Sequence, residues 1–132
     1  MSMGKSATPL GKVRGLGPAG HGGGHWIEER FTSVVLVLLS LWLLFSLMML
    51  PALDRATLVE WLRAPAGAVP MALFVIAAFK HGLDGMKVVV DDYVHAEGNR
   101  IATHFVLSMA AIGGAALSLF ALAKIAFGAV AQ

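Results

Sequence analysis

The residues best suited to chemistry in this 132-residue chain lie in one stretch, residues 81–95, which reads HGLDGMKVVVDDYVH. It follows directly on an apolar run, PMALFVIAAFK. On a helix that advances about 100° per residue, Asp92 lies about 20° and Gly85 about 40° around the axis from His81. One stripe of a helix would therefore carry an imidazole, a glycine one turn later and a carboxylate further along.

This stripe has a structural interpretation and a functional one. A neutral imidazole is a common axial ligand of haem iron, and a glycine would let a flat macrocycle lie against the helix backbone. A helical histidine can equally be a hydrogen-bonded structural residue, and a glycine can equally serve close helix packing. Ionisable residues inside membrane spans mark functional sites by default. His81 is therefore the candidate metal ligand, and Gly85 a candidate cofactor contact.

Tyr93 follows His81 by twelve residues, about 18 Å along a helix. A tyrosine at a membrane interface is usually an anchor in the aromatic belt. Its phenol can also donate a hydrogen bond to a carbonyl oxygen, because an ordinary pKa near 10 keeps the proton in place. Tyr93 and the adjacent Asp92 are the candidate catalytic pair, although Asp91 and Asp92 can equally form a solvated helix end.

Four further charges, Lys80, Asp84, Lys87 and Asp91, follow one another at spacings of four, three and four residues. Such spacings let opposite charges meet turn by turn. Each unpaired ion at the bilayer centre costs about 2.5–3.5 kcal/mol. The ladder can be a self-neutralised face turned toward protein, or it can contact a cofactor carboxylate or a substrate.

The elements that must position these residues are membrane helices. Apolar residues make up 58% of the chain and its mean hydropathy is +0.76, above the roughly 45–50% apolar content of soluble domains. Spans are predicted at about 31–50, 69–90 and 101–128, after a polar tail over residues 1–29. Small residues in the third span favour close helix packing. The predicted fold is an all-α transmembrane bundle of three helices spanning 30–130.

Composition also excludes several classes of protein. There is no cysteine, which excludes disulfides and thiolate metal sites. The ten Lys and Arg residues are scattered, with no aromatic-basic patch, so nucleic-acid binding is not expected.

The loop between the first two spans contains a short amphipathic segment. Its apolar residues are expected at the membrane interface and its charged residues in water. The apolar set is Leu58, Trp61 and Leu62, and the charged set is Arg55, Glu60 and Arg63.

The distribution of positive charge predicts an orientation. Five basic residues flank the spans on the N-terminal side: Lys5, Lys12, Arg14, Arg30 and Arg100. The opposite side carries fewer, which predicts a cytoplasmic N-terminus and a periplasmic C-terminus in the inner membrane.

The sequence resembles a known family. HGLDGMKVVVDDYV is similar to the signature of the hydrophobic membrane anchor of succinate dehydrogenase, complex II, in which a mid-helix histidine precedes a glycine at +4 and Asp-Tyr at +11 and +12. The segment TPLGKVRGLGPAGHGGGHWIEERFTSVVLVLLSLW is similar to the alphaproteobacterial and mitochondrial-type versions. Together the two matches cover roughly half the chain, and the three-span arrangement fits the rest.

The resemblance implies a function in the respiratory chain and the tricarboxylic acid cycle. It implies that His81 is one axial ligand of haem b, with the other from a second anchor subunit, which packs beside this chain. Tyr93 would bind a ubiquinone carbonyl with support from Asp92, and Arg30 would lie near the haem propionates or the quinone. FAD and iron–sulfur clusters belong to the flavoprotein and iron–sulfur partner subunits, so this chain is not catalytic alone.

The other histidines are given structural interpretations. His21 and His25 flank a glycine run and are expected in a solvated linker, since a metal site needs more ligands and a stiffer backbone. His95 is expected at the interface. His104 either reaches toward the haem propionates or the quinone, or bonds to a neighbouring helix.

Two competing functions remain. The charge ladder could line the path of a small ion or proton transporter, although the other two spans offer little beyond Ser and Thr. A purely structural anchor would keep the helices and need no His81.

Overall fold

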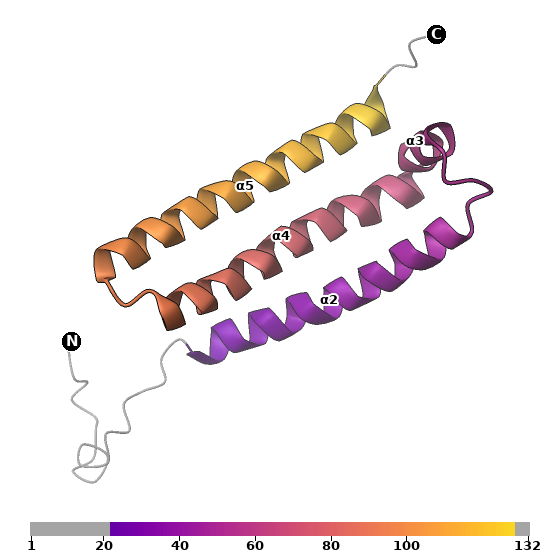
Figure 1. Cartoon of the computed structure of the whole chain (residues 1–132). Helices are drawn as coiled ribbons and strands as arrows, with labels where there is room; N and C mark the ends of the chain where they lie inside the picture. Colours follow the sequence, from indigo (N-terminus) through magenta and orange to yellow (C-terminus); the bar gives the residue numbers. More distant parts are fainter. Residues whose placement is uncertain (1–21, 129–132) are drawn as a thin grey trace.

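The computed structural model describes residues 22–128, and within them all regular structure is helical. The helices are α2 (Gly22–Met48), α3 (Arg55–Arg63), α4 (Pro65–Tyr93) and α5 (Glu97–Phe127), drawn in Figure 1. Three of them, α2, α4 and α5, are long and apolar enough to cross a membrane. The predicted all-α transmembrane bundle is confirmed.

The helices extend beyond the apolar runs at several ends. Helix α2 begins at Gly22, so the predicted tail over residues 1–29 overlaps it, and His25 lies in a helix rather than in a linker. Residues 1–21, including His21, lie outside the described part. Glu and Arg are good helix formers, so the polar flank HWIEER continues the helix past the apolar segment. Helix α4 starts at Pro65, a residue whose missing N–H costs nothing in a first turn.

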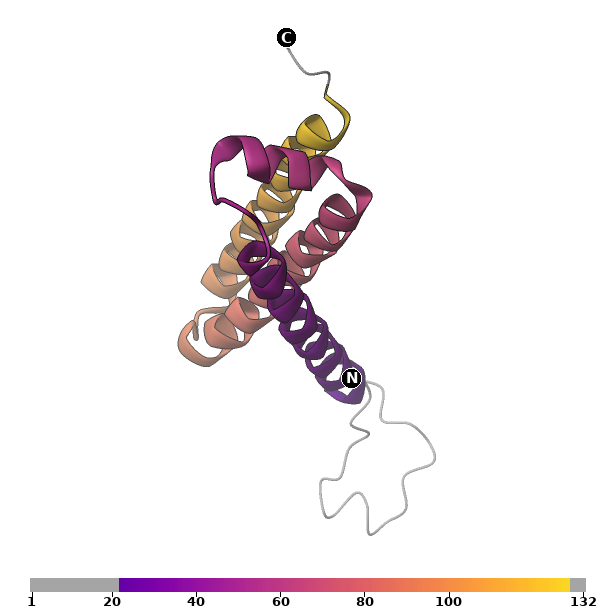
Figure 2. The same cartoon turned by 90° about the vertical axis from the view of Figure 1, so that its right-hand side faces the viewer.

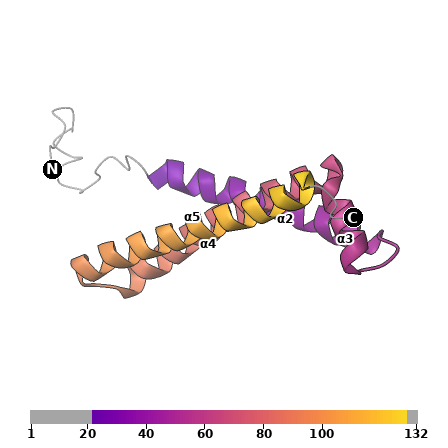
Figure 3. The ribbon, with the colours of Figure 1, turned by 90° about the horizontal axis from the view of Figure 1, so that it is seen from above.

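Helix α4 is the central element and packs against both α2 and α5 (Figure 1). The start of α2, the end of α4 and the start of α5 lie at one end of the bundle, here called the Tyr93 end. Figures 2 and 3 show α2 crossing the α4–α5 pair at an angle, so its first turns diverge from the last turns of α4.

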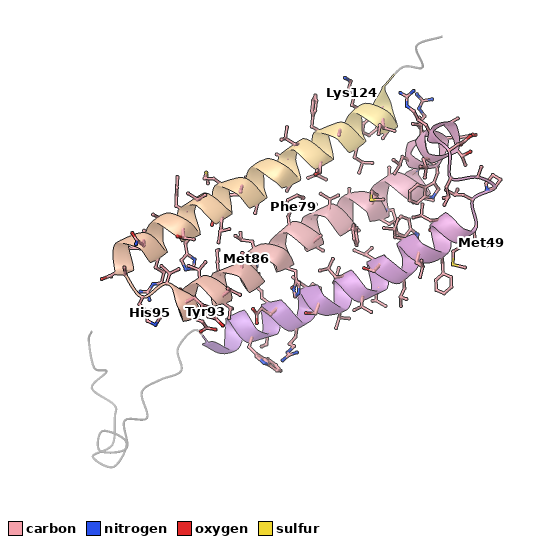
Figure 4. The ribbon with its side chains drawn as sticks, viewed as in Figure 1. Met49, Phe79, Met86, Tyr93, His95 and Lys124 are labelled. Atoms are coloured by element: carbon pink, nitrogen blue, oxygen red, sulfur yellow. The ribbon has the colours of Figure 1, made fainter. Side chains whose placement is uncertain are left out.

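Close packing between α4 and α5 depends on a small residue. The ring of Phe79 lies over Gly114, where a Cβ would come within 2.6 Å of the ring atom Cε1. Figure 4 shows Phe79 between the two helices. Most of the large apolar side chains of residues 22–128 instead face outward, as expected when lipid rather than water surrounds the helices.

Helix α3 lies across the opposite end of the bundle and contacts α4 and α5. Its cap is Asp54, whose carboxylate accepts a hydrogen bond from the Thr57 amide at 2.9 Å. Trp61 stacks on Trp42 of α2, with ring centroids 5.6 Å apart. A Cβ at Gly67 would collide with the Trp61 carbonyl, so the tight α3–α4 corner requires glycine.

The predicted separation of apolar and charged residues on α3 is confirmed. The apolar set is half-buried and the charged set is exposed. Part of the apolar side packs against protein, however, since α3 contacts α4 and α5.

Candidate functional site

His81 lies near the middle of α4, half-buried on the side that meets α2. Its Nδ1 atom is 3.1 Å from the hydroxyl oxygen of Thr32 on α2, a residue 49 positions away in the chain. The Thr32 hydroxyl in turn donates to the Glu29 carbonyl at 3.1 Å. The candidate metal ligand is thus held by a neighbouring helix through one of its two ring nitrogens.

Gly85 lies one turn beyond His81, and space is open beside it. A Cβ built at this position meets no atom within 4 Å in the described part of the chain. Close packing inside this chain is therefore not the reason for a glycine here, in contrast to Gly67 and Gly114.

An ion pair adjoins His81 on the same helix. Lys80 donates to Asp84 at 2.5 Å and lies 3.7 Å from Glu28 of α2. Asp84 is 6% exposed and is the one buried polar residue among residues 22–128. The carboxylate is tolerated at this depth because its ammonium partner is one helical turn away.

The predicted ladder breaks after this first pair. Asp91 does not pair with Lys87 but with α5, where its carboxylate is 2.8 Å from His104 Nε2 and 3.9 Å from Arg100 Nε. Within residues 22–128 Lys87 forms no ion pair. His104 therefore bonds to a neighbouring helix, one of the two alternatives that the sequence left open. The charged residues occupy only the second half of α4, because residues 65–79 carry no charge, so they do not form a polar stripe along the whole helix.

The candidate catalytic pair lies at the Tyr93 end, on the last turn of α4. The Tyr93 side chain is 79% exposed and Asp92 is exposed beside it. His95 lies close by, with its Nδ1 3.2 Å from the Tyr93 carbonyl oxygen, and Figure 4 shows both side chains at this end. The distance along α4 from His81 to Tyr93 is about 18 Å, so the two belong to separate sites on one helix.

Arg30 is not brought close to His81 within this chain. It follows Glu29 on α2 and lies about 200° around the helix from Thr32, the residue that meets His81. Its guanidinium instead lies 5.4 Å from the ring centroid of Trp26, in cation–π contact. Arg30 therefore points away from the α2–α4 contact.

Metal-binding side chains do not gather elsewhere in the described region. No three His, Asp or Glu residues among residues 22–128 converge to form a metal site. What α4 presents as a candidate metal ligand is a single imidazole, that of His81.

Comparison with known proteins assigns the chain to a family. The family model for the succinate dehydrogenase/fumarate reductase transmembrane subunit matches residues 4–122. The chain belongs to this family. A succinate dehydrogenase hydrophobic membrane anchor subunit from Rickettsia bellii is 35% identical over 83 residues, which cover 63% of this chain and 66%, just under two thirds, of that relative. The subunit of the same name from Paracoccus denitrificans is 28% identical over 125 residues, 93% of this chain and 95% of the relative.

The three apolar helices and the membership of this family together indicate a multi-pass membrane protein. The Paracoccus denitrificans match covers nearly the whole chain and therefore all three spans. The resemblance stated from the sequence is confirmed.

Sequence reasoning did not identify the α2 residues that contact α4. Glu28 and Thr32 are four residues apart and so lie on one face of a helix. Both are polar residues at the start of an apolar span, which was the available signal. The sequence did not show which helix these two residues face.

Proposed function

We propose that this chain is the hydrophobic membrane anchor subunit of a succinate dehydrogenase, complex II. Together with a second anchor subunit it would hold the flavoprotein and iron–sulfur subunits, which carry FAD and the iron–sulfur clusters, at the cytoplasmic face of the inner membrane. It would contribute one axial ligand to haem b and part of a ubiquinone-reduction site. The observation that carries the proposal is a half-buried imidazole in a membrane helix, held by one nitrogen beside an open glycine.

The residues around His81 fit a haem. A metal-binding histidine typically engages one nitrogen with a polar neighbour and offers the other to the metal. His81 Nδ1 engages Thr32, while its Nε2 makes no hydrogen bond within residues 22–128. The open space at Gly85 is compatible with a flat ring against the helix. Haem b, when bound, supplies a one-electron carrier.

The Tyr93 end fits a quinone carbonyl. The Tyr93 phenol is a hydrogen-bond donor on a last helical turn, where the side chain is exposed and free for another subunit or a substrate. Asp92 beside it offers a carboxylate that can pass protons between the aqueous phase and the site. Ubiquinone reduction consumes two protons with two electrons, so a polar helix end suits the substrate better than mid-bilayer would.

The proposed orientation places the Tyr93 end at the cytoplasmic face and the C-terminus in the periplasm. The segment before α2, the first turns of α2 and the first turn of α5 carry the larger share of the basic residues that flank the spans. Arg30 is on this side of the membrane, facing away from α4, and we assign it to contacts with the haem propionates or the quinone pocket formed with the partner anchor.

The test of the haem assignment is His81→Ala in the assembled complex. Haem b should be lost or strongly reduced in the reduced-minus-oxidised spectrum of the purified complex, because an axial donor is missing. His104→Ala is the matched control, since it removes a half-buried histidine that binds Asp91 instead. An unchanged b-type spectrum in His81→Ala would refute the assignment.

The test of the quinone assignment is Tyr93→Phe, which removes only the phenolic hydroxyl. Succinate-to-quinone activity should fall about 10²–10³-fold, as for other single hydrogen-bond donors at reacting oxygens. Succinate-to-dye activity should persist, because that reaction bypasses the membrane site. Unchanged succinate-to-quinone activity would remove Tyr93 from the quinone site, whereas equal loss of both activities would indicate failed assembly. His95→Gln, a change at the same helix end, is the control.

A further inference from the structure

A hydrogen bond with Thr32 of α2 holds the ring of His81, the candidate haem ligand. Thr32 Oγ1 takes part in two hydrogen bonds, one with the Glu29 carbonyl at 3.1 Å and one with His81 Nδ1 at 3.1 Å. A hydroxyl has a single proton, and a carbonyl oxygen can only accept. The Thr32 proton therefore goes to Glu29, and His81 Nδ1 must carry the proton that it donates to Thr32.

This arrangement determines the tautomer of the ring. A neutral imidazole has one N–H and one lone pair, so a protonated Nδ1 leaves the lone pair on Nε2. We propose that Thr32 is a positioning residue for His81, orienting the ring and directing the Nε2 lone pair to the haem iron. This inference rests on the proposed function, in which His81 is an axial ligand.

A second contact keeps Thr32 opposite His81. Glu28 lies on the same face of α2, one turn before Thr32, and its carboxylate is 3.7 Å from Lys80 on α4. Lys80 directly precedes His81, so two contacts one turn apart join the same two helices. A slide of one helix by a turn, about 5.4 Å, would break both contacts at once.

The local surroundings strengthen this arrangement. His81 and Thr32 are both half-buried within a membrane span, where water is not available to replace a lost partner. A hydrogen bond donated by Nδ1 also increases electron density on the ligating nitrogen. This favours the ferric over the ferrous state, so removal of the acceptor should raise the reduction potential.

The test is Thr32→Val in the assembled complex, because valine keeps the branched shape and removes the hydroxyl. A redox titration of the haem absorption band should show a two- to tenfold higher ferrous-to-ferric ratio at a fixed ambient potential, an upward shift of about 18–59 mV for one electron. The low-spin ferric electron paramagnetic resonance signal should shift as well, because the ring is no longer held. Thr32→Ser, which retains the hydroxyl, should restore both values.

The matched control is Ser33→Ala. Ser33 donates to the same Glu29 carbonyl, at 2.7 Å, but lies about 100° further around α2 than Thr32. Its removal should leave the haem potential and the resonance signal unchanged. If Thr32→Val does not assemble, Thr32→Ala is measured in its place and read in the same way.

The role of Thr32 would be overturned by an unchanged potential and resonance signal in the valine variant, by an equal shift in the serine variant, or by an equal shift in Ser33→Ala. Complete haem loss supports the role if serine restores binding, and overturns it if serine does not. Failure of the proposed function is a separate result, because His81→Ala would then retain the haem. Haem loss in His81→Ala with no change in Thr32→Val overturns only the positioning role.

Discussion

A single methyl group added at Gly114 should loosen the pairing of α4 with α5. A Cβ at this position would lie 2.6 Å from Cε1 and 2.9 Å from Cζ of Phe79. Carbon atoms in contact prefer about 3.5–4.0 Å, so the ring has to retreat by about 1 Å. The neighbouring Gly113 has nothing within 4 Å of such a Cβ, so alanine is accommodated there.

The expected cost follows from this overlap. Adding a methyl to a packed interface typically costs about 1–3 kcal/mol, through off-rotamer side chains and backbone shifts. That corresponds to about a 5- to 150-fold change in the equilibrium between packed and separated helices. The intrinsic helix propensity of alanine over glycine opposes the loss by about 1 kcal/mol, and Gly113→Ala measures that gain alone.

The assay compares Gly114→Ala with Gly113→Ala in detergent, using a titration with sodium dodecyl sulfate. The chain has no cysteine, so two introduced cysteines, one on α4 and one on α5, carry a donor and an acceptor dye. Energy transfer between them should be lost at lower denaturant in Gly114→Ala. Adding Phe79→Leu, which removes the clashing ring atoms, should recover part of the difference. Equal midpoints for the two alanine variants would refute the packing argument.

Two further changes test the polar contacts. Lys80→Met leaves the buried Asp84 carboxylate without its partner. We expect the free energy of insertion or assembly to become less favourable by about 2.5–3.5 kcal/mol, measured as the fraction of membrane-integrated chain. Adding Asp84→Leu should restore that fraction. Asp54→Ala should fray α3, and its effect should depend on pH. The Thr57 hydrogen bonds hold the pKa of Asp54 below its usual value, so the stabilisation is present above the unfolded pKa near 3.9 and is lost as pH falls through the lowered folded pKa. Thermal melts against pH should show this acid dependence in the parent chain, and a variant as pH-sensitive as the parent would contradict it.

The helices could be predicted from the sequence because apolar runs of membrane length have few alternative structures. Their ends could not, because helix formation continues into polar flanks such as residues 22–30, which hydropathy does not detect. The Pro65 start of α4 was also missed, although proline is favoured in a first helical turn.

The candidate site was predictable only along one helix. Spacing placed His81, Gly85 and Asp92 on one stripe and correctly paired Lys80 with Asp84. Spacing failed for Asp91, because a competing partner on α5 was closer than the lysine one turn away.

Contacts between helices depend on how each helix is rotated about its axis. The contact of Thr32 with His81 joins residues 49 apart and depends on the relative rotation of α2 and α4. Hydrophobic periodicity leaves that rotation open when nearly every face of a helix is apolar. The assigned roles of His81, Tyr93 and Arg30 stay predictions.

The order of the helices along the chain matters for how the protein is made. Helix α4 is the least apolar of the three spans, yet its Lys80 meets Glu28 of α2, a helix that is synthesised and inserted first. When α4 leaves the ribosome, Glu28, one of the two carboxylates that pair with Lys80, is already in the bilayer. A fragment of residues 65–128 that is produced without α2 would present Lys80 to lipid without that partner. Its yield of inserted chain should fall, and should recover when α2 is produced before it in the same chain.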